Sequence, residues 1–180
     1  MIRTSWAVSP IAIFEPFRPC PTVSSPARRF LIVEDDSLVR ESMLRFFRSR
    51  GHDVAEAATV AEAEQALSEK RPDAVVLDYQ LPDGDGLALL DMVRSIDPTI
   101  PTVLLTSHGT IDLAVRAIKE GADQFFTKPV ELPTLLVVLE RLVEKARDRM
   151  AALASRSRSS RRRVDPFVGE SSSIRRLKEQ

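Results

Sequence analysis

Apolar positions between residues 30 and 147 follow two alternating patterns. Short continuous apolar runs, beginning with FLIV at 30–33, indicate strands that are buried on both faces. Between these runs, apolar residues recur three or four positions apart, as Val39, Met43 and Phe47 do, which indicates one buried face of a helix. The two patterns predict five strands, each followed by a helix, with the strands at 30–33, 52–57, 74–77, 101–106 and 124–126.

Capping and turn residues mark the ends of several of these elements. Ser37 suits the N-cap of the first helix, and Gly51 is expected to end it. Thr59 and Glu62 have the spacing of a capping box, which predicts the start of the second helix. The segment LPDGDG at 81–86 is rich in turn residues and is expected to be a loop.

The repeated strand-helix order defines the fold class. Apolar strands that alternate with amphipathic helices predict a parallel sheet covered by helices on both faces. Right-handed crossovers between parallel strands then favour a doubly wound α/β fold.

Charge is distributed unevenly along the chain. The 26 basic and 26 acidic side chains cancel overall, but residues 30–147 hold 13 basic against 21 acidic ones, and the two flanks carry the opposite excess. An acidic central domain does not suggest binding to nucleic acid. No apolar run reaches the roughly 18 residues that a membrane span needs, so no membrane association is expected.

The first 29 residues differ in composition from the domain that follows. Four prolines interrupt their apolar stretch and no convincing cleavage motif follows, which argues against a signal peptide. Residues 1–29 are expected to be a disordered leader, or sequence read from a start codon placed too far upstream. Cys20 is the single cysteine, which fits a reducing, cytoplasmic compartment.

Polar side chains follow four of the five predicted strands. Glu34 and Asp35 come after the first strand, Asp78 after the third, Thr106 after the fourth and Lys128 after the fifth. Because the carboxyl ends of parallel strands meet at one edge of a sheet, these side chains are expected to converge there.

This set of side chains suggests a site for a metal ion and a phosphoryl group. Clustered carboxylates repel one another unless a cation lies among them, and hard oxygen ligands suit Mg²⁺. Lys128 would oppose the metal unless an anion completes the site. Asp78 is the candidate nucleophile toward phosphorus, with Lys128 and the metal neutralising the phosphoryl oxygens and Thr106 donating a hydrogen bond.

Four segments together resemble the motifs of response-regulator receiver domains from two-component signalling: EDDSLVR, VVLDYQLPDGDGL, VLLTSHGT and FFTKPVEL. The resemblance covers residues 30 to about 147. It implies a flavodoxin-like sheet with strand order 2-1-3-4-5, which is the order found in chemotaxis receivers.

The resemblance also implies a role for each site residue. Asp78 would be the phosphoacceptor, and the Mg²⁺ ligands would be Glu34, Asp35, Asp78 and the backbone carbonyl of Gln80. Glu34 stands where many relatives carry Asp, which is expected to shift metal affinity. Lys128 would bind the phosphoryl group, and Thr106 and Phe125 would act as the switch residues. Gln80 and His108 would tune how long the phosphoryl group lasts. The resemblance also implies a cis peptide bond at Lys128–Pro129.

Several of the polar and aromatic residues also have ordinary structural interpretations. Asp36 is expected to be a charge at the start of a helix, and Asp83 and Asp85 are expected to form turns. His52 is expected at a surface turn, and His108 in an exposed loop. Phe125 suits the core as well as it suits a switch.

The fifth helix is expected to extend beyond the domain. An apolar stripe continues along it with the spacing of a two-stranded coiled coil, although the alternative is a packing face that frays after about Lys145. The segment SRSRSSRRR indicates a flexible basic linker, so residues 148–165 are expected to be the end of the linker helix and that linker. The stripe consists of Leu135, Leu139, Leu142, Ala146, Met150 and Leu153.

The last residues resemble the opening of another domain. VDPFVGESSSIRRLKEQ is similar to the start of the AAA+ domain of sigma-54-dependent activators of the nitrogen-regulation type, so residues 166–180 are expected to be a truncated piece of it. No nucleotide-binding loop or helix-turn-helix follows, so neither ATP hydrolysis nor DNA binding is expected from this chain.

The sequence therefore predicts a phospho-switch and not an enzyme. Its expected partners are a sensor histidine kinase and a second copy, paired through the fourth and fifth helices and the linker helix. One alternative is a stand-alone phosphorelay receiver with no output domain. The other is an aspartyl-nucleophile phosphohydrolase, which Gln80 disfavours because those enzymes need an acid two residues after the nucleophile.

Overall fold

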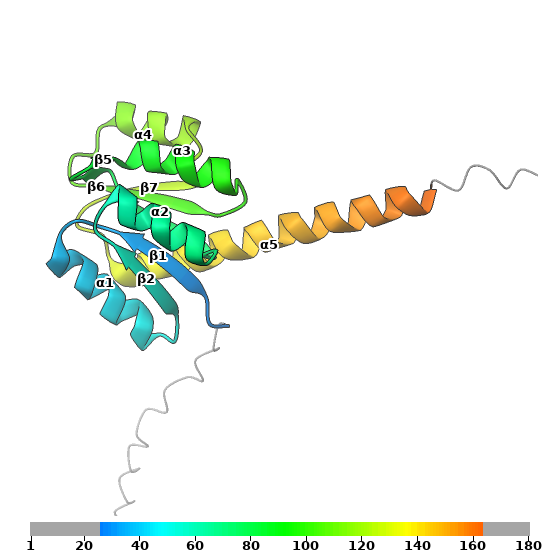
Figure 1. Ribbon diagram of the computed structural model, residues 1–180, viewed down its shortest axis with the longest axis horizontal. Coiled ribbons are helices and arrows are strands. Elements are labelled where there is room, and N and C mark those ends of the chain that lie inside the picture. The colour runs from blue at the N-terminus through cyan, green and yellow to red at the C-terminus, as the bar shows by residue number, and fades with distance from the viewer. Residues whose placement is uncertain (1–25, 164–180) are drawn as a thin grey trace, which may run out of the picture.

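The computed structural model describes residues 26–163, with side chains as far as residue 155. Five parallel strands form one twisted sheet with helices on both faces (Figure 1). In chain order the elements are β1 Arg29–Val33, α1 Ser37–Ser49, β2 Asp53–Ala57, α2 Val60–Glu69, β3 Ala74–Asp78, β4 Gln80–Leu81, β5 Gly84–Asp85, α3 Gly86–Ile96, β6 Thr102–Thr106, α4 Ile111–Lys119, β7 Gln124–Thr127 and α5 Leu132–Arg163.

The sheet has the order β2-β1-β3-β6-β7, which confirms the predicted doubly wound topology. Counting only its own strands, this is the order 2-1-3-4-5. The pairs are all parallel, as the crossover helices require. The sequence pattern did not predict β4 and β5, a small antiparallel hairpin that begins at Gln80 and overlaps the LPDGDG loop.

Two apolar layers enclose the sheet. One layer packs side chains of α2, α3 and α4 against alternate residues of β1 and β3 such as Leu31 and Leu77. The other packs α1 and the first part of α5 against the opposite face, around Phe30, Phe47 and Leu139. The strands β1, β3 and β6 are buried on both faces, which is why their sequences are continuously apolar.

The start of the domain differs from the prediction. The leader was expected to end at residue 29, but Arg29 already belongs to β1 and Arg28 is buried. The main-chain N–H of Arg29 donates to Asp73 Oδ2 at 2.9 Å, which fixes this end of the strand. Residues 1–25 of the predicted leader lie outside the described residues.

Two predictions about the surroundings of α1 were wrong. The N-cap is Asp36 and not Ser37, because the Asp36 carboxylate accepts hydrogen bonds from the main-chain N–H groups of Leu38 and Val39 at 2.8 and 3.1 Å. His52 is buried and not at the surface, since its ring packs against the Phe30 ring with a centroid distance of 4.9 Å.

Helix α5 extends well past the sheet (Figure 1). The flexible linker that the sequence predicted from residue 155 is helical as far as Arg163, and the helix does not fray after Lys145. No glycine or proline occurs between residues 134 and 163, while alanine and arginine favour the helix. The expected AAA+ segment at 166–180 lies outside the described residues.

The predicted apolar stripe of α5 has two separate environments. Leu135 and Leu139 are fully buried in the domain's own core and Leu142 packs against it, so these three residues are not free for a coiled coil. Met150 and Leu153 are exposed. A stripe available to a partner can therefore begin only near the end of the domain.

Helix α4 presents an apolar face to solvent. Ile111 is 84% exposed and Ile118 is 50% exposed, with Val115 beside them, while Ala117 is the only residue of this helix that is fully buried. An exposed apolar face of this kind is unusual for a surface helix and is typical of an interaction surface. None of the described helices combines the length and the apolar character needed to cross a membrane.

Candidate functional site

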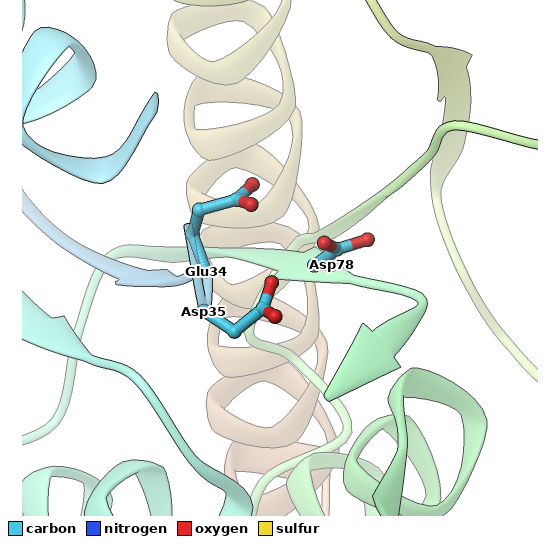
Figure 2. A group of neighbouring side chains, drawn as sticks. All are labelled: Glu34, Asp35 and Asp78. Atoms are coloured by element: carbon cyan, nitrogen blue, oxygen red, sulfur yellow. The ribbon is translucent and has the colours of Figure 1, made fainter. Parts of the chain in front are cut away.

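Three carboxylates meet at the carboxyl edge of the sheet. Glu34 and Asp35 follow β1, and Asp78 is the last residue of β3 (Figure 2). One oxygen from each residue lies within 4.8 Å of the others. Glu34 and Asp78 are buried, whereas Asp35 is exposed, so the cluster opens to solvent on the side of Asp35.

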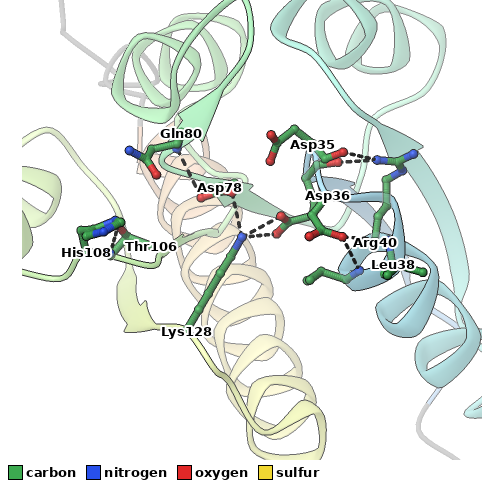
Figure 3. Close-up of polar contacts among 11 residues, drawn as sticks. Asp35, Asp36, Leu38, Arg40, Asp78, Gln80, Thr106, His108 and Lys128 are labelled. Atoms are coloured by element: carbon green, nitrogen blue, oxygen red, sulfur yellow. Dashed lines mark hydrogen bonds and ion pairs between the residues drawn. The ribbon is translucent and has the colours of Figure 1, made fainter.

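Lys128 bridges the two buried carboxylates (Figure 3). Its Nζ donates a hydrogen bond of 2.7 Å to Asp78 Oδ2 and another of 2.7 Å to Glu34 Oε1. The peptide bond between Lys128 and Pro129 is cis, as the resemblance implied. The four side chains lie at the carboxyl ends of β1, β3 and β7. The single ammonium group of Lys128 offsets part of the negative charge of the three carboxylates.

The electrostatics of the site follow from burial and from these close contacts. Burial raises the pKa of Glu34, and the charge of Asp78 adds to this rise while Lys128 opposes it. Burial alone would lower the pKa of Lys128, but its hydrogen bonds and ion pairs with Asp78 and Glu34 outweigh that effect and raise the pKa. The lysine is therefore positively charged at neutral pH.

Backbone contacts fix the acidic turn after β1. The Arg40 guanidinium donates to the carbonyls of Glu34 and Asp35 at 2.6 and 3.2 Å (Figure 3). Asp36 does not belong to the cluster of Glu34, Asp35 and Asp78, and its carboxylate caps α1, which confirms its prediction as a helix-start residue. These contacts of Arg40 were not predicted, because the hydrophobic pattern of a helix does not indicate which carbonyl groups an arginine on it will reach.

The segment after β3 is held close to the phosphoacceptor candidate. The main-chain N–H of Gln80 lies 3.3 Å from Asp78 Oδ1, and the N–H of Gly86 donates to the Tyr79 carbonyl at 2.8 Å. Gly86 has no room for a side chain, since a Cβ there would overlap the Asp78 carbonyl oxygen. Gln80 itself is exposed beside the site.

The remaining predicted residues surround the site on the side of β6 and β7. Thr106 is fully buried, and its Oγ1 accepts a hydrogen bond of 3.1 Å from the main-chain N–H of His108. His108 lies in an exposed loop, as predicted. Phe125 is half-buried and packs against the α2-α3-α4 layer, so it contributes to the core. Its role as a switch remains a prediction.

The side chains present fit a magnesium ion. The donors are hard carboxylate oxygens, which Mg²⁺ prefers, and the exposed position of Asp35 leaves room for water ligands. Glu34 Oε2 is buried and has no hydrogen-bond partner among the described residues, although Lys128 Nζ lies 2.6 Å away as an ion pair. The Lys128 ammonium therefore balances the buried Glu34 carboxylate here, and a metal ion would share Glu34 with it.

Comparison with known proteins identifies the family. The model of the response regulator receiver domain matches residues 30–140, so the chain belongs to that family. The transcriptional regulatory protein PrrA of Mycobacterium tuberculosis is 37% identical over 123 residues, which are 68% of this chain and 52% of PrrA. The chain therefore spans about half the length of this relative.

Two further relatives extend the comparison. The C4-dicarboxylate transport transcriptional regulatory protein DctD of Rhizobium meliloti is 32% identical over 161 residues, which are 86% of this chain and 34% of DctD. Among solved structures, the beryllofluoride-activated NtrC4 receiver domain dimer is 32% identical with a TM-score of 0.63, and the match covers 66% of this chain and 98% of that one. These relatives show a receiver domain of the kind that occurs in transcriptional regulators.

Proposed function

We propose that this chain is a phosphorylation switch in which Asp78 accepts a phosphoryl group from a sensor histidine kinase. The observation that carries the proposal is the contact between Asp78 and Lys128 within a cluster of three carboxylates. A lysine at hydrogen-bond distance from a candidate nucleophile is suited to receive the oxygens of an incoming phosphoryl group.

Glu34, Asp35, Asp78 and the Gln80 carbonyl would hold Mg²⁺, which would neutralise charge on the phosphoryl oxygens when bound. A carboxylate oxygen of Asp78 attacks the phosphorus of a phosphohistidine and forms an acyl phosphate. The P–N bond breaks, and its electron pair leaves with the imidazole nitrogen of the kinase. Lys128 holds its proton throughout and orients the transferred group, and Thr106 donates to one of its oxygens.

The output is proposed to depend on pairing of two chains. The exposed apolar face of α4 and the exposed end of the α5 stripe offer surfaces for a second copy. The NtrC4 receiver relative is described as a beryllofluoride-activated dimer, which supports the same assembly here. We further propose that this cytoplasmic switch controls sigma-54-dependent transcription. The sequence of residues 164–180 and the match to DctD support this part of the proposal.

Light scattering with Mg²⁺, before and after addition of beryllofluoride, tests this switch. The expected result is a larger native mass for the wild type and an unchanged mass for Asp78→Asn. An unchanged wild-type mass would favour a stand-alone phosphorelay receiver. Steady turnover of phosphate esters would instead favour a phosphohydrolase, which we do not propose because Gln80 occupies the position of the second acid.

A further inference from the structure

Asp83 links the hairpin beside the phosphoacceptor candidate to a distant helix. It lies on the turn between β4 and β5, yet its carboxylate accepts hydrogen bonds from the main-chain N–H groups of Val60 and Ala61, at 2.8 and 3.1 Å. Both are in the first turn of α2, 23 and 22 positions away in the chain. From the sequence, Asp83 was expected only to form a turn.

The first turn of α2 depends on this contact for two of its hydrogen bonds. The N–H groups at the start of a helix have no carbonyl partner inside the helix. In α2 the N-cap residue Thr59 serves one of them, because its Oγ1 accepts from the N–H of Glu62 at 3.1 Å. Asp83 serves the N–H groups of Val60 and Ala61, so the helix is capped jointly by its own N-cap and by the hairpin.

The other end of the same hairpin borders the carboxylate cluster. Gln80 pairs with Asp85, and Leu81 with Gly84, so the hairpin contains only two residue pairs. Its first residue, Gln80, has its N–H beside Asp78 Oδ1, and its backbone carbonyl is one of the proposed metal ligands. A hairpin this short has little stability of its own, so its contacts with the rest of the domain determine its position.

Two further contacts hold the hairpin. Leu81 is buried in the α2-α3-α4 layer, and Asp85 caps α3 by accepting from the N–H of Ala88 at 2.7 Å. These contacts fix the hairpin to the α3 side of the domain. Among the described residues, Asp83 is the only one that joins the hairpin to α2 by hydrogen bonds.

We propose that Asp83 is a positioning residue that couples the metal and phosphoryl site to the N-terminus of α2. The inference rests on the proposed function, since it takes the Gln80 carbonyl as a metal ligand. Asp83 holds the hairpin so that this carbonyl faces the carboxylates. Because coupling between two sites is reciprocal, occupation of the metal site also stabilises the first turn of α2.

Two measurements on the full chain test this coupling. The first is the dissociation constant for Mg²⁺ by calorimetry, at a temperature well below the melting midpoint of every variant. The second is hydrogen exchange at the amides of Val60 and Ala61, with and without Mg²⁺. The variants are Asp83→Ala and Asp83→Asn, with Asp91→Ala as a matched loss of one exposed carboxylate on α3.

In the wild type, Mg²⁺ is expected to slow exchange at Val60 and Ala61. Asp83→Ala is expected to weaken Mg²⁺ binding by about fivefold or more and to abolish that Mg²⁺-dependent slowing. Asp83→Asn is expected to lie between the two, because the amide retains one acceptor oxygen without the charge. Asp91→Ala is expected to match the wild type in both measurements.

Three results would overturn the inference. In the first, hydrogen exchange at Val60 and Ala61 rises in Asp83→Ala while the Mg²⁺ dissociation constant stays at the wild-type value. Asp83 would then cap α2 without coupling it to the metal site. Equal weakening by Asp83→Ala, Asp83→Asn and Asp91→Ala would show only the loss of negative charge. A wild-type chain that binds no Mg²⁺ would overturn the proposed function as well, which distinguishes the two failures.

Discussion

Lys128 Nζ lies 2.7 Å from Asp78 Oδ2, although the two residues are 50 positions apart in the chain. The parallel sheet brings them together, because β3 and β7 end at the same edge on either side of β6. The same ammonium group also contacts Glu34, so one positive charge serves two buried carboxylates. Lys128 would therefore compete with a metal ion for these carboxylates, and its charge would favour an anion bound beside them.

Replacement of Lys128 by methionine is expected to strengthen Mg²⁺ binding. The substitution keeps much of the length of the side chain but removes a positive charge that lies 2.7 Å from two carboxylates. We expect the dissociation constant at pH 8 to fall by roughly tenfold, equivalent to about 1.4 kcal/mol. Calorimetry checks this, with Lys119→Met on α4 as the control. Equal or weaker binding by Lys128→Met would contradict the competition.

Gly86→Ala is expected to disturb the site as well as the fold. The added methyl group would overlap the Asp78 carbonyl oxygen and lie 2.9 Å from the Tyr79 Cα, and neither backbone atom can move freely. We expect a loss of about 1–3 kcal/mol in the free energy of unfolding, together with weaker Mg²⁺ binding. Urea denaturation and calorimetry measure the two effects. A wild-type free energy of unfolding and a wild-type Mg²⁺ affinity would show that the backbone at Asp78 shifts to accept the methyl group without an energetic cost.

Stability is expected to fall in mild acid because His52 is buried. Burial lowers the pKa of His52 below its ordinary value of 6.5; Glu140 opposes the shift, whereas Arg28 adds to it. The unfolded chain then binds the proton more readily than the folded one. The stabilising contribution is therefore complete above about pH 6.5 and is lost as the pH falls through the folded-state pKa.

Urea midpoints at several pH values test the assignment to His52. As the pH falls below 6.5, the wild type should lose stability relative to His52→Phe. The reason is that the phenylalanine ring keeps the packing against Phe30 but cannot titrate. His108→Gln, which changes the other histidine of the chain, should leave the pH dependence unaltered. A constant difference across the range would assign the acid sensitivity to other groups.

The exposed face of α4 is expected to matter for assembly and not for folding. Ile111→Asp places a charge at a position that is 84% exposed, so the free energy of unfolding should change by less than about 0.5 kcal/mol. The same variant should lose the beryllofluoride-dependent increase in native mass. Ile96→Asp, at the exposed end of α3, is the matched control and should keep it. Loss in both variants, or in neither, would remove this face from the proposed interface.

The sequence was sufficient to predict the sheet because its central strands are buried on both faces. Such strands are continuously apolar, as β1, β3 and β6 are, and they stand out from the amphipathic helices between them. Once the strands are parallel, the residues after them must share one edge. The convergence of Glu34, Asp78 and Lys128 could therefore be predicted before the structure was known.

The features that could not be predicted depend on contacts between distant segments or on local backbone geometry. Asp36 and Ser37 are both good N-cap residues, and only the backbone geometry selects Asp36. Burial of His52 depends on Phe30 of a neighbouring strand, and the second role of Asp83 depends on α2. The two-residue strands β4 and β5 are too short to have a hydrophobic period.

The central claim is that Asp78 accepts a phosphoryl group, and intact-mass spectrometry tests it most directly. The chain is incubated with Mg²⁺ and a small-molecule phosphodonor, and the modified residue is then mapped by proteolysis. We expect the wild type to gain one phosphoryl group at Asp78 and to gain none when Mg²⁺ is chelated before the donor is added. Asp78→Asn should gain none, and labelling of this variant to the wild-type extent would contradict the assignment.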